Sequence, residues 1–183
     1  MSLVFGAAVA IILLGSFLYH QTNVIKVDTV EVSISHLPKE FENFTIVQIS
    51  DLHGKSFGSN QCRLIKLMRK EDFDILVLTG DMFKDNDNLA SLVELKPIVD
   101  YVHSQGKKVY FVAGNHDLAA DYRRISTELT RWGVHILDNE AHIIKRNEAV
   151  LNIIGVKDAL LGMANLEQAI ARVNKGVKIL LAH

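Results

Sequence analysis

The sequence predicts an α/β fold in which a mostly parallel first sheet packs against a second sheet. Three observations support this prediction. From about Phe44 onwards, short apolar runs typical of buried strands alternate with helical patterns, as in sheets with crossover helices. After Val134, strand-like segments follow one another closely, which favours a hairpin. The composition, 49% hydrophobic and 22% charged with two prolines, is typical of a globular domain.

The N-terminal segment is apolar. The run Leu3–Tyr19 contains no charged residue and lies at the short end of the about 17–25 residues that a membrane-spanning helix needs. A cleaved signal peptide is the alternative, but no Lys or Arg precedes the run and no small-x-small cleavage site follows it. We therefore expect residues 1–22 to be a membrane anchor or signal segment and residues 23–183 to be the folded domain.

The first half of the domain alternates strands with helices. Val24–Ser35 alternates apolar and polar residues, so it predicts a first strand that ends before Pro38. The leucine-rich segment Leu89–His103 predicts a helix, with a kink or break where Pro97 lacks an N–H group. The remaining elements expected here are strands at Thr45–Ile49, Asp74–Thr79 and Lys108–Ala113 and a helix at Ser59–Lys70.

The second half is richer in strands. Asp121–Trp132 has the apolar spacing of a helix and is closed by Gly133. A hairpin is expected to turn at Asn147–Glu148. The remaining elements expected here are strands at Val134–Leu137, Ala141–Arg146, Ala149–Ile154 and Val177–Ala182 and a helix at Leu166–Val173.

Charge and cysteine content exclude several classes of function. The net charge of −1 provides no basic surplus, so no nucleic-acid partner is expected. Cys62 is the only cysteine, which rules out an intrachain disulfide and a cysteine-based zinc site. The oligomeric state is not indicated by the sequence.

Metal-competent side chains follow four of the predicted strands at the point where each strand ends. They are Asp51 and His53, Asp81, the run Asn115–Asp117, and His183. Each fragment alone is better explained as a turn or a cap, because Gly-Asp and Asn-His-Asp suit polar loops. The whole set favours one shared site, since ligands of open α/β sheets bind at the carboxyl ends of the strands.

The residue types predict a centre for two divalent cations. Asp, His and Asn offer oxygen and nitrogen donors without a thiolate, which suits manganese, iron, nickel or zinc. A carboxylate shared by two cations lets them clamp a phosphoryl group, and the cations lower the pKa of bound water toward neutrality. A nearby imidazole can protonate the leaving alkoxide.

The order Asp-x-His, Gly-Asp, Gly-Asn-His-Asp and a later His resembles the calcineurin-like metallophosphoesterases. The resemblance covers about Phe44 to His183. It implies an α/β/β/α sandwich that hydrolyses phosphate mono- or diesters, including lipid-linked or nucleotide substrates. By position it also implies roles for single residues: Asp51 and His53 bind the first metal, Asp81 bridges both, Asn115 and His183 bind the second, His116 is the general acid, and Asp117 orients it.

Both ends of the sequence bear on this resemblance. The apolar N-terminus and the string VQISDLH are similar to bacterial membrane-associated members, which implies a single-pass protein of the bacterial cell membrane with an extracytoplasmic domain. The family's Gly-His-x-His motif normally follows the last single His, but the sequence ends at His183. The resemblance therefore implies a sandwich that is incomplete at the C-terminus. The alternative is a catalytically incompetent, membrane-tethered fragment that binds metal or phosphate.

Loop residues Lys55, Phe57 and Asn86 are candidates for substrate contact.

Overall fold

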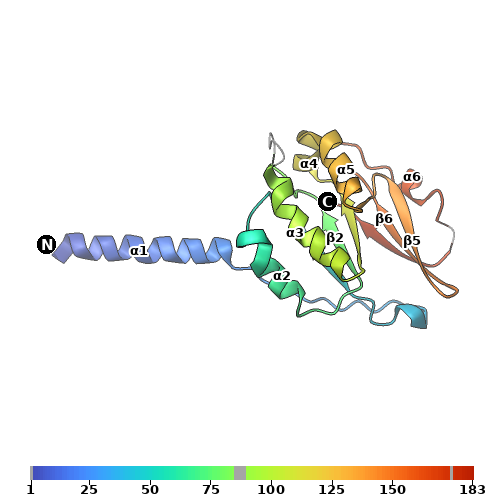
Figure 1. Ribbon diagram of the computed structural model, residues 1–183, viewed down its shortest axis with the longest axis horizontal. Helices are drawn as coiled ribbons and strands as arrows, with labels where there is room; N and C mark the ends of the chain where they lie inside the picture. The colour runs from blue at the N-terminus through green and yellow to red at the C-terminus, as the bar shows by residue number, and fades with distance from the viewer. Residues whose placement is uncertain (1, 85–89, 174) are drawn as a thin grey trace. The chain divides into compact units, whose positions relative to one another are not determined.

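The computed structural model describes residues 2–84, 90–173 and 175–183, and the chain forms two compact units, Met1–Val32 and Ser33–His183. The first unit contains helix α1 (Ser2–Asn23), followed by residues without regular structure (Figure 1). The strand predicted at Val24–Ser35 is therefore wrong. Alternation stabilises a strand only when one face is buried, whereas Val30 and Val32 are 81% and 72% exposed. The predicted boundary after residue 22 stays a prediction.

The predicted membrane anchor is also wrong. Within the described ranges, the structure contains no helix that is both long and apolar enough to cross a membrane. The predicted single-pass location in a bacterial cell membrane, with an extracytoplasmic domain, is corrected with it.

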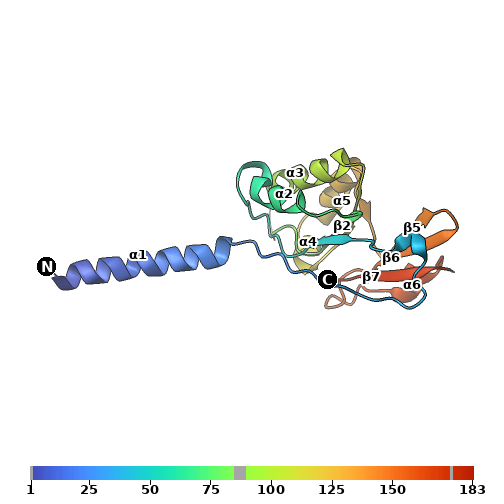
Figure 2. The same ribbon diagram turned by 90° about the horizontal axis from the view of Figure 1, so that it is seen from below.

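The second unit is built on a four-stranded parallel sheet with the strand order β1-β2-β3-β4. Its strands are β1 (Ile46–Ile49), β2 (Ile75–Thr79), β3 (Lys108–Val112) and β4 (His135–Ile136). Every residue of β2 is buried, as expected for a strand covered on both faces. One face is covered by helices (Figure 2). They are α2 (Cys62–Met68), α3 (Ala90–Ser104) and α5 (Tyr122–Arg131).

Helix α3 runs unbroken through Pro97, so the predicted break is wrong, while a kink there stays a prediction. The missing N–H group of Pro97 leaves the carbonyl of Val93, four residues earlier, without its helical partner. Val93 is 71% exposed, so water can reach this part of the helix. Two short 3₁₀ helices, η1 (Lys39–Phe41) and η2 (Ser59–Gln61), precede β1 and α2.

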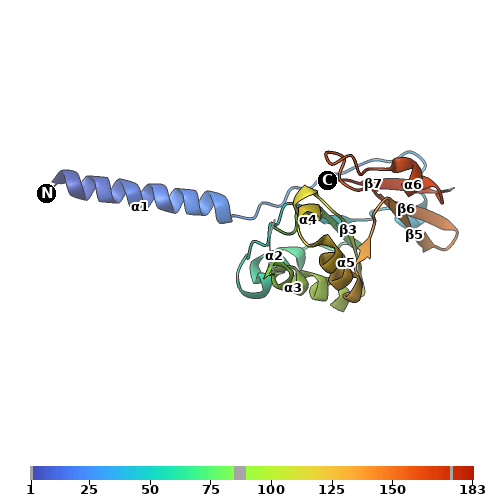
Figure 3. The ribbon, with the colours of Figure 1, turned by 90° about the horizontal axis from the view of Figure 1, so that it is seen from above.

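A second sheet has the strand order β5-β6-β7. Strands β5 (Glu140–Arg146) and β6 (Ala149–Gly155) form an antiparallel hairpin, and β7 (Val177–Leu181) runs parallel to β6. Asn147 turns the hairpin with a φ of 51°, which confirms the predicted turn. Helix α6 (Leu166–Ile170) packs through Ala169 on the outer face of this sheet (Figure 3). The layers therefore follow the order helices, sheet, sheet, helix.

One hydrophobic core lies between the two sheets. Phe41 from η1 is fully buried there, and the guanidinium of Arg146 lies 5.4 Å from its ring centre and forms an ion pair with Asp74. This contact joins the hairpin of the second sheet to the residue that precedes β2. The strand residues that meet in this core include Ile75, Val77, Tyr110, Val112, Leu151 and Ile153.

Three rings pack together where β3, β4 and β5 meet. His135 stacks on Tyr110 at 5.1 Å between ring centres, and His142 lies 4.3 Å from His135. Nζ of Lys108 is 3.3 Å from Nε2 of His142, a contact that requires this nitrogen to be unprotonated. Burial, followed by the charges of His135 and Lys108, lowers the pKa of His142 to about 4.

This low pKa predicts a specific pH dependence of stability. Between about pH 6.5 and pH 4 the unfolded chain binds a proton at His142 and the folded chain does not, so the free energy of unfolding falls as the pH is lowered. We expect the fall between pH 7 and pH 5 to be about 1 kcal/mol smaller in a His142→Gln variant, because solvent at this half-buried ring weakens the full effect. Urea unfolding at both pH values measures it.

The matched control is His36→Gln, which changes an exposed histidine of the same unit. Only the difference between the two pH values is compared, so a general loss of stability in either variant does not affect the result. An equal pH dependence of the free energy of unfolding in the unmodified protein, His142→Gln and His36→Gln would contradict the prediction.

Candidate metal centre

The loops that leave β1, β2 and β3 are joined directly by hydrogen bonds from backbone N–H groups. The N–H group of Asp51 donates to the carbonyl of Gly80 at 3.1 Å, and that of His53 donates to the carbonyl of Asp81 at 3.0 Å. The N–H group of His116, in α4 (Asn115–Ala119), donates to Oδ1 of Asp81 at 3.0 Å. Parallel neighbouring strands end at one sheet edge, so these loops lie close enough to bond.

Three residues in these loops have left-handed backbone conformations that are uncommon for residues other than glycine. The φ angles are 55° at Asp51, 47° at His53 and 54° at Asp81. Such conformations cost on the order of 1–3 kcal/mol each and tend to cluster at functional sites. Here they occur at three of the predicted metal ligands.

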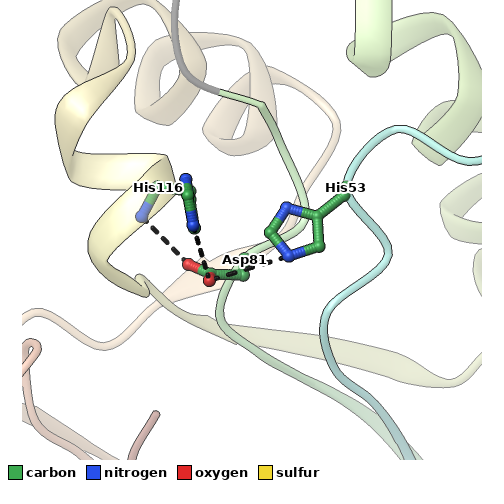
Figure 4. Close-up of side chains that lie close together, drawn as sticks. All are labelled: His53, Asp81 and His116. Carbon is green, nitrogen blue, oxygen red and sulfur yellow. Dashed lines mark hydrogen bonds and ion pairs between the residues drawn. The ribbon is translucent and has the colours of Figure 1, made fainter.

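Asp81 lies at the centre of the cluster and is only 4% exposed. Its Oδ2 atom is 3.9 Å from Nε2 of His53 and 3.8 Å from Nε2 of His116 (Figure 4). Nε2 of His183, at the end of β7, lies 3.3 Å from the same oxygen. On the open side of the site, Oδ1 of Asp51 is 4.0 Å from Nε2 of His53.

The ligand atoms form two overlapping groups, His53–Asp81–His116 and Asp51–Asp81–His183, each with all atoms within 4.8 Å of one another. Two atoms that bind the same ion at about 2.1 Å lie at most about 4.2 Å apart. The separations of 3.3 to 4.0 Å around Asp81 and His53 satisfy this limit. The oxygen and nitrogen donors suit a first-row divalent cation, and Asp81 belongs to both groups.

The imidazole of His183 is held in one tautomer. Its Nδ1 atom is 2.9 Å from the carbonyl oxygen of Thr79, which can only accept, so Nδ1 carries the proton. In the neutral ring Nε2 then presents its lone pair toward Asp81, as a metal ligand requires. Burial lowers the pKa of His183, but the bond to Thr79 and the charges of Asp81, Asp51 and Asp158 together raise it above its ordinary value.

The carboxylate of Asp117 fastens two loops of the site. It is fully buried and accepts hydrogen bonds from the N–H groups of Asp81 at 2.7 Å, Phe83 at 2.9 Å and Gly114 at 3.0 Å. Burial is the largest influence on this group and raises its pKa to about 6, although the three backbone donors act to lower it. Asp117 therefore holds the loop after β2 against the loop after β3.

The sequence profile of the calcineurin-like phosphoesterase family matches residues 44–183, which include every residue of this cluster. The chain belongs to that family. Membership makes metal-dependent hydrolysis of phosphoesters the general chemistry of the domain, and it confirms the family to which the sequence motifs pointed.

Two curated relatives of the phosphoesterase come from Bacillus subtilis (strain 168). The uncharacterized metallophosphoesterase YkoQ is 26% identical over 189 residues, an alignment that covers 96% of this chain and 67% of YkoQ. The uncharacterized protein YpbG is 26% identical over 141 residues, covering 76% of this chain and 52% of YpbG.

The structure of the phosphoesterase brings five of the predicted residues together: Asp51, His53, Asp81, His116 and His183. Asn115 directly precedes His116, whose N–H group donates to Asp81. His116, predicted as the general acid, also lies where it can share an ion with His53 and Asp81. The roles assigned to these residues, including that of Asp117 in orienting His116, stay predictions.

Two glycines of the phosphoesterase leave room for the cluster. A Cβ atom on Gly80 would lie 2.5 Å from the ring of His183, and one on Gly114 would lie 2.2 Å from Oδ1 of Asp81. Gly80 has a φ of 87°, whereas Gly114 has a φ of −92°, so at Gly114 space alone demands glycine.

Sequence reasoning missed Asp158. It follows β6 as the other acidic residues follow β1 and β2, and this position after a buried strand was the available signal. Its side chain is 1% exposed, and Oδ1 accepts the N–H group of Leu161 at 2.9 Å. Among the predicted substrate contacts, Nζ of Lys55 lies 5.1 Å from the ring centre of Phe57, and Asn86 lies outside the described residues.

Proposed function

We propose that the phosphoesterase hydrolyses phosphate mono- or diesters, including lipid-linked or nucleotide substrates, with two divalent cations bound at the Asp81 cluster. The observation that carries this proposal is the position of Asp81 in both groups of candidate ligands. Two cations that share one carboxylate can clamp both the attacking and the leaving oxygen of an in-line displacement. Manganese, iron, zinc and nickel all fit the mixed nitrogen and oxygen donors.

In this proposal the residues of the chain divide the work of binding. By the order of the motifs, Asp51 and His53 would hold one cation and Asn115 and His183 would hold the other, with Asp81 shared between them. The two groups of donor atoms around Asp81 instead pair His53 with His116 and Asp51 with His183. The cations supply Lewis acidity and a water molecule of lowered pKa. The hydrogen bond from His183 to Thr79 keeps the ligating nitrogen aimed at Asp81, a support of the kind that commonly orients metal-bound histidines.

His116 is proposed as the proton donor to the leaving oxygen. Its ring packs edge to face with that of His53, with 4.9 Å between the ring centres, and its side chain is 39% exposed. A substrate oxygen can therefore reach the ring from solvent. The hydrogen bond from the N–H group of His116 to Oδ1 of Asp81 holds the start of α4 beside the carboxylate that would bind the cations.

A protein that binds cations and phosphate without turnover is the alternative function. The observation in its favour is that each described group offers only three His or Asp donors. Catalytic sites keep an open position for water or substrate, so this feature fits both functions. Turnover distinguishes them.

The test combines metal analysis with an activity assay. We expect the purified protein to contain bound divalent metal and to release nitrophenol from bis-p-nitrophenyl phosphate or p-nitrophenyl phosphate. Chelation should abolish the activity, and adding back manganese, iron, zinc or nickel one at a time should restore it. Bound metal without turnover of either ester would support the binding protein instead. Full activity after complete chelation would overturn both.

A further inference from the structure

An apolar pocket adjoins the cluster on the side of α4. It has a volume of about 520 Å³ and is lined by Asn115, Leu118, Ala119, Tyr122, Leu161 and Met163. Asn115, a predicted metal ligand, lines the pocket and directly precedes His116 in α4. The other lining side chains are apolar or aromatic, so the character of the surface changes from polar to apolar within one turn of α4.

The far wall of the pocket is a loop that exposes large apolar side chains. Leu161 is 51% exposed and Met163 is 42% exposed. Exposed apolar side chains grouped around a pocket commonly mark a ligand site. Their position beside Asn115 places such a ligand next to the proposed cations.

The loop that contains Leu161 and Met163 has a defined conformation, because buried side chains form hydrogen bonds with its backbone. Nδ2 of Asn139 donates to the carbonyl of Met163 at 3.0 Å, and Oδ1 of Asn139 accepts the N–H groups of Lys157 and Asn165. Asn139 is 8% exposed. Asp158 accepts the N–H group of Leu161, as described above. The backbone that carries Leu161 and Met163 is therefore fixed by hydrogen bonds.

Tyr122 of α5, which also lines the pocket, is held in place by polar contacts. The hydroxyl group of Tyr122 donates to Oδ1 of Asp138 at 2.7 Å, and Nζ of Lys157 lies 3.4 Å from Oδ2 of the same carboxylate. The polar end of Tyr122 is thus engaged by Asp138. The part of Tyr122 that a ligand in the pocket can contact is therefore its apolar ring.

We propose that this pocket binds the apolar ester group that stays on the phosphoryl group, so that the phosphoesterase prefers phosphodiesters whose retained ester is a longer alkyl chain over those with a small one. The proposal rests on the proposed function, because the phosphoryl group must sit at the Asp81 cluster for its ester group to reach past Asn115. Leu161 and Met163 set this preference. The volume of the pocket lies within the range of small-molecule sites, about 300–1,000 Å³.

A series of p-nitrophenyl phosphodiesters with methyl, propyl and hexyl second esters tests the proposal. All three release the same nitrophenolate, so differences in kcat/KM report the alkyl group. We expect kcat/KM to rise about two- to fourfold per methylene over the first few carbons, since burial of each is worth at most about that factor. In Met163→Gln and in Leu161→Asn the ratio of hexyl to methyl turnover should fall toward one.

Leu160→Asn is the matched control, because Leu160 is in the same loop, is 87% exposed and does not line the pocket. It should keep the ratio of the unmodified protein. An equal kcat/KM for methyl and hexyl esters would overturn the pocket proposal while leaving the proposed function intact. If no ester is hydrolysed, the proposed function fails. Calorimetry with methylphosphonate and hexylphosphonate on the metal-loaded protein then tests the pocket proposal separately. Tighter binding of hexylphosphonate supports the pocket proposal, and equal binding of the two overturns it.

Discussion

Replacing Asp81 with asparagine is expected to lower kcat/KM for nitrophenyl phosphoesters by about a thousandfold or more and to reduce the amount of bound metal. Oδ2 of Asp81 lies within 4 Å of ring nitrogens from His53, His116 and His183. A cation bound by any of these histidines would therefore lie next to the negative charge of Asp81. Cations stabilise the charge of the transition state by several kcal/mol, and each 1.36 kcal/mol is a tenfold change in rate. Metal analysis and steady-state kinetics measure the two effects.

Asp100→Asn is the matched control for this variant. Asp100 is an exposed residue of α3 that pairs with Lys96, so the substitution removes the same charge away from the cluster. Asparagine at position 81 keeps Oδ1, which accepts the N–H group of His116, so the domain should remain folded. Thermal unfolding checks this point. Near-normal activity in a folded Asp81→Asn protein would contradict the placement of the metal centre.

A Gly80→Ala substitution is expected to lower kcat/KM about a hundredfold through displacement of His183. The added Cβ would lie 2.5 Å from the imidazole ring, closer than packed atoms come, so the ring must move. Movement of a catalytic group by about 1 Å can cost on the order of a hundredfold in rate. The free energy of unfolding should also fall by about 1–2 kcal/mol, because the φ of 87° is left-handed.

Gly106→Ala separates these two effects. Gly106 follows α3 with a φ of 69°, and a Cβ atom there would meet nothing within 4 Å. We expect the backbone strain and the loss of stability to resemble those of Gly80→Ala, with activity retained. Similar losses of activity in both variants would show that strain alone, and not the position of His183, explains the effect.

The convergence of the site could be predicted because each motif follows a strand of the predicted sheets. Strands β1, β2 and β3 are parallel neighbours, so the positions of Asp51, Asp81 and Asn115 at their ends imply one sheet edge. The same reasoning applied to β6 would have found Asp158. Distances from Asp81 to the three histidines could not be predicted, because they depend on the left-handed turns at Asp51, His53 and Asp81.

Patterns without a packing partner were the source of the errors. Val24–Ser35 has the alternation of a strand, but no sheet buries either face, and Val30 remains exposed. Leu3–Tyr19 has the composition of a membrane segment, but no described helix meets the length and apolarity of a span. A local sequence pattern shows which secondary structure a segment is able to form, and burial against other elements decides whether the segment forms it.

The amino-acid sequence alone is enough to identify the α/β layering, the family and the residue types of the metal centre, since periodicity and motif spacing are local properties of the chain. The tertiary structure was needed to show that His183 reaches Asp81 from the second sheet, that Asp117 joins two loops, and that an apolar pocket opens beside Asn115. These features arise from side chains far apart in sequence. Their contacts exist only after the two sheets have packed against each other.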